Sequence, residues 1–208
     1  MNPLASPVCY AEDAEQARDV ANWRRAERKH LLTERAALSI TDRQAMAQAL
    51  AGHLDQLLAR RFGTMSGLVL SFYWPIQSEL DLRFWAVRVH NNGVKLALPV
   101  VETPQAPLIF RPWTPGCAMQ RGFWNIPVPD TVESVLPDIA LAPLVGWDDQ
   151  GYRLGYGGGY FDRTLAAIRP HAIGVGLSQA RLTTIFPQVH DIRLDAILTE
   201  KGTAHEQC

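Results

Sequence analysis

The stretch from residue 68 to residue 101 constrains the fold of this chain more than any other part of the sequence. A near-continuous apolar run at 68–73 lies between Gly67 and Pro75 and predicts a buried strand. A helical pattern follows over about 79–91, and a second strand is predicted over 94–101. A strand, a helix and a strand within about 35 residues form a βαβ unit, whose two strands are parallel. The sequence therefore predicts an α/β protein with a mostly parallel sheet.

The remaining predicted elements extend this unit into layers. Two helices come first, one over about 13–38 and one that starts at a capping box of Thr41 and Gln44 and ends near Gly63. The second helix has an apolar stripe at helical spacing, made of Met46, Leu50, Leu54, Leu57 and Leu58. Further strands are predicted at 108–110, 139–145, 172–177 and 196–198, a helix over 161–168, and a long irregular segment over 112–138. This order favours one three-layer α/β/α sandwich over residues 13–208, preceded by a loose tail over residues 1–12.

Composition and charge exclude several classes of protein. The chain has 208 residues, 47% of them hydrophobic and 20% charged, which argues against a disordered chain. A net charge of -1 implies no large nucleic-acid surface. The three cysteines, Cys9, Cys117 and Cys208, form no CxxC pair and favour a reducing cytosol without disulfides or zinc. With no signal-peptide pattern and no apolar run near the roughly 20 residues of a membrane helix, we expect a soluble cytoplasmic protein without a membrane partner.

A glycine-rich stretch, GYGGGYFDR at 155–163, follows the buried strand at 139–145 and opens a predicted helix. Helix N-termini present unpaired N–H groups, and glycines let the backbone approach a phosphate closely. The stretch lacks the Lys-Ser/Thr ending of a P-loop and the GxGxxG spacing of a dinucleotide fold, so a turn without a ligand is the alternative. Arg153 favours phosphate binding, because a guanidinium can bind two phosphate oxygens. Asp162, on the first helical turn, is placed either to hold Mg²⁺ or to cap the helix.

The segment GYRLGYGGGYFDR at 151–163 resembles the signature of the 5-formyltetrahydrofolate cyclo-ligase family. The matching residues are Asp148, Gly151, Arg153, Leu154, Gly155, Gly157, Gly159, Tyr160, Phe161 and Asp162. The likeness runs from about Trp23 to Glu200 in the order of the family. Its other parts are the basic helix of Arg24, Arg28 and Arg35, Glu79 after the strand end at 72–75, the segment WNIPVP at 124–129, and Gln179, His190, Asp191 and residues 197–200.

The resemblance implies the fold shared with ribose-5-phosphate isomerase and CoA-transferase domains. It also implies the ATP- and Mg²⁺-dependent conversion of 5-formyltetrahydrofolate to 5,10-methenyltetrahydrofolate, with catalytic roles for Arg153, Tyr160 and Asp162. The residues it assigns to ATP are Arg24, Arg28, Arg153, Leu154, Gly155, Tyr156, Gly157, Gly158, Gly159, Tyr160 and Asp162. Those it assigns to the folate are Trp74, Glu79, Trp124, Tyr156, Gly157, Gly158, Gly159 and Tyr160. Its metal ligands are Asp162 and Asp191.

Two other functions stay open at the level of the sequence. Some members of the family carry lysine where this chain has Gly158, and lysine near Arg24, so a folate- or nucleotide-binding homologue without turnover is one alternative. Charge patterning alone favours a solvated helix face for the basic residues at 24–35, rather than a phosphate-binding surface. Val128 and the segment 112–138 bear on the folate pocket, so an ATP-dependent ligase for another small substrate is the second alternative. The oligomeric state is not predicted.

Overall fold

The computed structural model describes residues 14–207, so the predicted tail over residues 1–12 lies outside the described residues. Its main sheet has seven strands in the order β12-β11-β9-β6-β1-β2-β3. The five inner strands are parallel: β11 (Ala196–Thr199), β9 (His171–Val175), β6 (Ile139–Pro143), β1 (Val69–Ser71) and β2 (Lys95–Val100). The edge strands β12 (Gly202–Glu206) and β3 (Ile109–Trp113) are antiparallel to their neighbours. The predicted mostly parallel α/β sheet is therefore confirmed.

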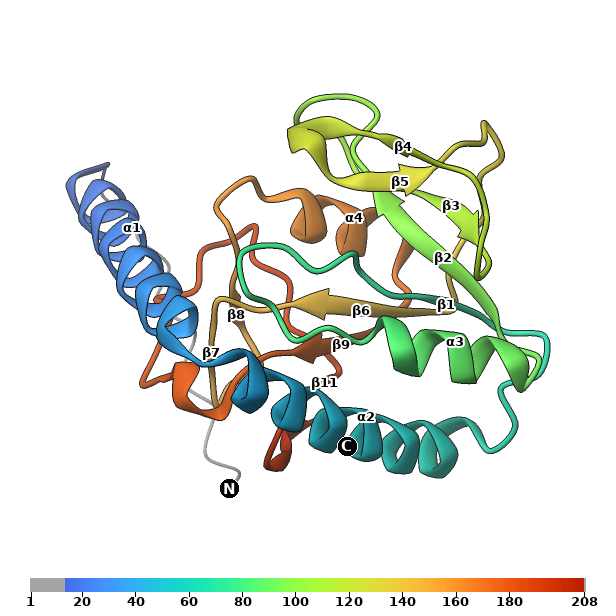
Figure 1. Cartoon of the computed structure of the whole chain (residues 1–208). Coiled ribbons are helices and arrows are strands. Elements are labelled where there is room, and N and C mark those ends of the chain that lie inside the picture. Colours follow the sequence, from blue (N-terminus) through green and yellow to red (C-terminus); the bar gives the residue numbers. More distant parts are fainter. Residues whose placement is uncertain (1–13, 208) are drawn as a thin grey trace, which may run out of the picture.

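Helices cover both faces of this sheet. α2 (Ile40–Phe62) and α3 (Arg83–Asn91) lie along one face, and α4 (Tyr160–Ile168) lies on the other (Figure 1). Alternate residues of β2 face opposite layers, as a strand period of two requires. Leu96 and Leu98 belong to the larger core under α2 and α3, whereas Ala97 packs in a smaller core with Phe110 and Phe161 of α4.

The helix α2 begins one residue after Ser39, which corrects the predicted capping box. Ser39 has an extended backbone, and its hydroxyl accepts a hydrogen bond from the Asp42 amide at 3.0 Å. Thr41 is already the second helical residue, so its side chain is past the capping position, and the assignment to Thr41 and Gln44 is wrong. The apolar stripe was predicted correctly, because Leu50, Leu54, Leu57 and Leu58 are all buried.

Replacement of Ser39 by alanine is expected to lower the free energy of unfolding by about 1 kcal/mol, because the Asp42 amide loses its acceptor. Chemical denaturation measures this difference. Thr41→Ala is the matched control, since it removes a hydroxyl two residues further on that caps nothing in α2. A larger loss of stability in Thr41→Ala than in Ser39→Ala would contradict the assignment of the cap.

Several short elements depart from the predictions. The helix predicted over 79–91 begins only at Arg83, after a turn in which Gln77 and Ser78 have positive φ angles of 45° and 63°. The segment predicted to be irregular contains the hairpin of β4 (Met119–Arg121) and β5 (Pro127–Pro129), joined through the 3-10 turn η1 (Phe123–Asn125). β12 and a small sheet of β7 (Gly146–Asp148), β8 (Arg153–Leu154) and β10 (Arg181–Leu182) were also missed. Apart from β12, these strands have two or three residues, too few to show a hydrophobic period.

The first helix, α1 (Ala14–Ala37), lies across the carboxyl ends of the parallel strands and extends beyond the body of the protein (Figure 1). Its residues at 24, 28, 31 and 35 follow helical spacing and therefore share one face. Among the described residues, no helix combines the length and the apolar character that crossing a membrane would demand.

Candidate active site

The glycine-rich loop connects β8 to α4 and lies against α1. Gly157 and Gly159 have positive φ angles of 94° and 65°, which favour glycine, and Gly159 is the N-cap of α4. A Cβ on Gly157 would lie 3.3 Å from Cζ of Arg28, so the guanidinium group packs directly on the loop backbone. The Nε of Arg28 is buried and has no hydrogen-bond partner among residues 14–207. Burial, together with the nearby charges of Arg24 and Arg25, lowers the pKa of Arg28.

Arg153 lies beneath the same loop and is almost fully buried. Its Nη2 is 3.0 Å from Oδ2 of Asp162, and its side chain is only 4% exposed. Neither Nε nor Nη2 makes a hydrogen bond of good geometry within the described part of the chain. Burial lowers the pKa of Arg153, whereas the charges of Asp162 and Asp191 raise it. Buried N–H groups without acceptors are costly, so this guanidinium is suited to bind an anion.

The predicted metal ligands Asp162 and Asp191 both lie near this guanidinium, and each already has partners. Asp162 accepts a hydrogen bond from the Ile192 amide at 3.2 Å, in addition to its ion pair with Arg153. Asp191 forms an ion pair with Arg24 and accepts the Gln188 amide at 2.6 Å. Within residues 14–207 there is no cluster of three or more His, Cys, Asp or Glu side chains arranged to hold a metal ion. Two carboxylates suit Mg²⁺ only where water and substrate phosphates supply its other ligands.

Arg24 is placed differently from Arg28. Its guanidinium donates hydrogen bonds to the backbone oxygens of Ile185 and Phe186, both at 2.9 Å, and contacts both carboxylate oxygens of Asp191. These bonds tie α1 to the chain segment before β11. Arg24 is therefore near the predicted metal ligand, and its role toward ATP stays a prediction.

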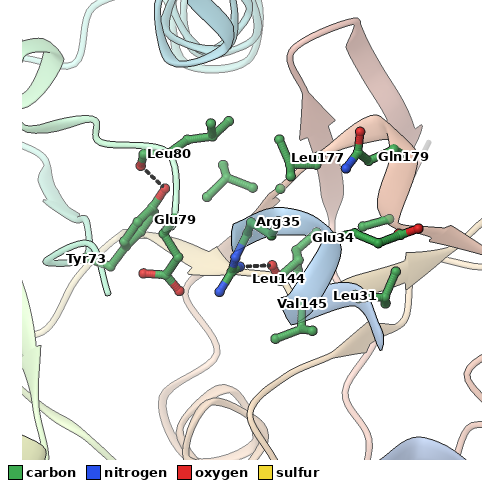
Figure 2. A pocket seen from close by; sticks show the side chains of 13 residues that line it. Leu31, Glu34, Arg35, Tyr73, Glu79, Leu80, Leu144, Val145, Leu177 and Gln179 are labelled. Carbon is green, nitrogen blue, oxygen red and sulfur yellow. Dashed lines mark hydrogen bonds between the residues drawn. The ribbon is translucent and has the colours of Figure 1, made fainter. Parts of the chain in front are cut away.

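A second part of the site is the pocket lined by Glu79 (Figure 2). Glu79 is 7% exposed, and its carboxylate points toward the guanidinium of Arg35 (Figure 2). One oxygen accepts the hydroxyl of Tyr156 at 2.6 Å, and the other accepts the Ile76 amide at 2.9 Å. Burial raises the pKa of Glu79, whereas these two hydrogen bonds and the charge of Arg35 lower it. The rest of the lining comes from the ends of β1, β6 and β9 and from α1 and is mostly apolar: Leu31, Leu80, Leu144, Val145, Val175 and Leu177.

Two of the four aromatic residues predicted for the folate site, Trp124 and Tyr160, meet at the glycine-rich loop. The rings of Trp124 and Tyr160 are perpendicular with centroids 5.5 Å apart, and the Trp124 residue is 63% exposed. A Cβ on Gly158 would lie 2.8 Å from Cδ2 of Tyr160, so the bare backbone makes room for the Tyr160 ring. Trp74 instead lies under the guanidinium of Arg83, 4.8 Å from Cζ to the ring centroid.

The other predicted loop residues have more limited parts. Leu154 is buried in the larger core, so only its backbone can face a ligand. Gly155 lies over Arg153, because a Cβ there would be 3.3 Å from Nη1. The hydroxyl of Tyr160 accepts the Gln105 amide at 3.4 Å, away from Glu79, whose partner is Tyr156.

The sequence interpretation missed two residues that shape the site. Arg35 was counted only in the basic helix, yet it is 5% exposed and lines the Glu79 pocket. Its spacing of seven residues from Arg28 places it on the same helix face and is the signal that could have found it. Asp148 matched the signature but received no role. It is fully buried and accepts the amides of Gln150, Tyr152 and Ile185, which fixes the β7–β8 turn before the glycine-rich loop.

These features define an α/β protein in which an anion-binding loop and a buried carboxylate meet at the carboxyl edge of a parallel sheet. Ligands bind at this edge in open α/β sheets. A model of the 5-formyltetrahydrofolate cyclo-ligase family matches residues 20–200, and the chain belongs to this family. Cyclo-ligases are ligases, so the protein is an enzyme of that class.

Known relatives support this assignment along most of the chain. The 5-formyltetrahydrofolate cyclo-ligase of Mycolicibacterium smegmatis is 30% identical over 186 residues, which cover 84% of this chain and 92% of that protein. The enzyme of the same name from Haemophilus influenzae is 30% identical over 63% of this chain and 71% of its own length. The structure of Aquifex aeolicus 5,10-methenyltetrahydrofolate synthetase matches with a TM-score of 0.72 at 29% identity, over 86% of this chain and 91% of that one. A synthetase from Mycoplasma pneumoniae, 24% identical with a TM-score of 0.66 over 85% and 98% of the two chains, shows the same fold.

Proposed function

We propose that this enzyme converts 5-formyltetrahydrofolate and MgATP to 5,10-methenyltetrahydrofolate, ADP and phosphate. The observation that carries the proposal is the hydrogen bond between Tyr156 of the glycine-rich loop and Glu79. Through this bond, a loop suited to phosphate and a buried carboxylate suited to a pterin belong to one site. The family assignment supports the same reaction.

The residues around the glycine-rich loop fit a triphosphate. Arg28 and Arg153 supply positive charge through N–H groups that make no hydrogen bond within residues 14–207, and the loop glycines leave its backbone open to phosphate oxygens. Asp162 and Asp191 would hold Mg²⁺, which neutralises charge on the phosphates when it is bound. Arg24 holds Asp191 in position for this role.

The folate would bind with its pterin against Glu79. A carboxylate can accept two parallel hydrogen bonds from the amino and ring N–H groups of a pterin, and Trp124 and Tyr160 supply aromatic walls beside the loop. The pocket has a free volume of about 10 Å³, which is room for about one water molecule. Entry of a pterin therefore requires the pocket to widen.

The proposed chemistry turns a poor leaving group into a good one. The formyl oxygen of the substrate takes the γ-phosphoryl group, and ADP leaves. N10 then forms a bond to the formyl carbon and loses its proton, and the carbon–oxygen bond breaks with release of phosphate. Arg153, Tyr160 and Asp162 act by positioning the groups and balancing charge, which is how proteins accelerate phosphoryl transfer.

The test is the absorbance of methenyl-folate in a mixture of purified protein, 5-formyltetrahydrofolate and MgATP. We expect growth of the band that depends on both ATP and Mg²⁺. Folate binding without growth would favour a homologue without turnover. Hydrolysis of ATP stimulated by a different small substrate, and not by the folate, would favour a ligase for that substrate.

We also propose a cytoplasmic location, because three scattered cysteines favour a reducing compartment.

A further inference from the structure

Arg35 ties together three loops at the carboxyl edge of the sheet. Its Nε donates to the backbone oxygen of Gln77 at 3.0 Å, in the loop after β1, and its Nη1 donates to that of Leu144 at 3.2 Å, after β6. Its Nη2 donates to the hydroxyl of Tyr156 at 2.6 Å, in the glycine-rich loop. A planar guanidinium presents N–H groups in fixed directions, so one residue of α1 sets the relative positions of all three loops.

The hydroxyl of Tyr156 lies between Arg35 and Glu79. It accepts from the guanidinium of Arg35 and donates to Oε1 of Glu79, also at 2.6 Å. The Ile76 amide donates to the other oxygen, Oε2, at 2.9 Å. Each carboxylate oxygen therefore has one donor and retains one lone-pair direction, which leaves Glu79 two acceptor sites for a ligand with two adjacent N–H groups.

We propose that Arg35 and Tyr156 are positioning residues for recognition of the folate, holding Glu79 as a charged, oriented acceptor and linking it to the glycine-rich loop. This inference rests on the proposed function. In this proposal Arg35 orients the hydroxyl of Tyr156 and does not bind the triphosphate. Tyr156 in turn orients the carboxylate of Glu79, in addition to lining the site.

The charges around Glu79 determine how this arrangement responds to pH. The groups that face it are Tyr156 from the glycine-rich loop, Arg35 from α1 and Tyr73 from the segment after β1. Glu34 of α1 lines the same pocket but pairs with His30 on the surface. Burial raises the pKa of Glu79, and the Tyr156 hydroxyl opposes this shift by donating to the charged form. Loss of that hydroxyl therefore raises the pKa of Glu79 further. A protonated carboxyl accepts fewer hydrogen bonds, so folate affinity falls as Glu79 becomes protonated. In a variant without the hydroxyl, this fall should begin at a higher pH than in the unchanged enzyme.

The experiment compares Tyr156→Phe and Arg35→Lys with the unchanged enzyme. Lysine keeps the charge of Arg35 but lacks the planar group that reaches three acceptors. We expect both variants to raise the KM for 5-formyltetrahydrofolate about tenfold, the scale of losing a hydrogen bond to a charged group, and the KM for ATP by less than about twofold. In Tyr156→Phe, the acidic limb of kcat/KM for the folate should move to higher pH, because Glu79 loses a hydrogen bond that lowers its pKa. Arg35→Lys keeps the charge and the Tyr156 hydroxyl, so its pH profile should move less.

Tyr73→Phe is the matched control for Tyr156→Phe. Tyr73 lines the same pocket, but its hydroxyl donates to the backbone oxygen of Leu80 at 2.8 Å and not to Glu79. Its removal should lower thermal stability and leave the pH profile in place. Circular dichroism of all three variants verifies that the fold is retained, and Tyr156→Phe serves as the test on its own if Arg35→Lys does not fold.

A binding measurement separates this inference from the proposed reaction. Quenching of tryptophan fluorescence reports the binding of 5-formyltetrahydrofolate in the absence of ATP. Weaker binding in Tyr156→Phe with a displaced pH profile supports the positioning role even if the unchanged enzyme shows no turnover. Equal rises in both KM values, or a pH profile that does not move in Tyr156→Phe, would overturn it. An unchanged protein that neither binds nor converts the folate would overturn both proposals.

Discussion

Replacement of Asp162 by asparagine is expected to lower kcat by roughly 10²- to 10³-fold, the scale of losing one group that balances charge in the transition state. Two effects act together in this variant. The proposed magnesium site loses one of its two carboxylates, and the buried guanidinium of Arg153 loses its ion-pair partner, 3.0 Å away. Asparagine keeps the size of the side chain and an oxygen that can still accept the Ile192 amide.

The measurement is turnover at saturating folate and ATP over a range of Mg²⁺ concentrations, below the melting temperature of the variant. Breaking a buried ion pair is expected to lower stability as well, by about 3 kcal/mol. Asp149→Asn is the control, because Asp149 also pairs with an arginine, Arg181, but on the exposed surface. An Asp162→Asn variant with the kcat of the unchanged enzyme would remove Asp162 from the metal role.

The parts of the fold that the sequence predicted correctly are those whose hydrophobic pattern extends over many residues. The stripe of leucines in α2 and the apolar strands β6 and β9 carry enough residues to separate helix from strand. β1 has only three residues, and it was found from the longer apolar run at 68–73 between Gly67 and Pro75. The hairpin of β4 and β5 does not, because two of the three residues of β5 are prolines. Its pairing depends on the turn at Trp124 and Asn125, which both have positive φ angles. Neither residue type predicts that backbone conformation.

The candidate site divides in the same way. The glycine-rich loop, Arg153 and Asp162 are contiguous in the chain, so the sequence could associate them. The set of Arg35, Tyr156 and Glu79 is not local, since its hydrogen bonds join residues 121 and 77 positions apart. These loops meet at one edge only because of the strand order of the sheet. A hydrophobic pattern along the chain does not predict that order. The same holds for the engagement of Arg24 with Asp191 across 167 positions.

Replacement of Glu79 by glutamine is expected to raise the KM for 5-formyltetrahydrofolate by about 10- to 100-fold, with the KM for ATP changed by less than about twofold. Glutamine keeps one acceptor oxygen, but its NH₂ group donates where the carboxylate accepted. A pterin N–H group would then face another donor inside a pocket that excludes most water, where an unpaired polar group is costly. The proposed ATP site should be spared, because its positive charge would come from Arg28, Arg153 and the loop backbone.

The pH dependence gives this prediction its sharpest form. Since burial raises the pKa of Glu79, the folate KM of the unchanged enzyme should rise as the pH falls through that pKa, whereas the KM of Glu79→Gln should stay flat. Glu34→Gln is the matched control, because Glu34 lines the same pocket with a side chain that is 45% exposed and pairs with His30 on the surface of α1. We expect it to keep the folate KM and its pH dependence. If Glu79→Gln raised both KM values equally, Glu79 would hold the loops in place rather than bind the pterin, and folate recognition would have to be sought beside Trp124 and Tyr160.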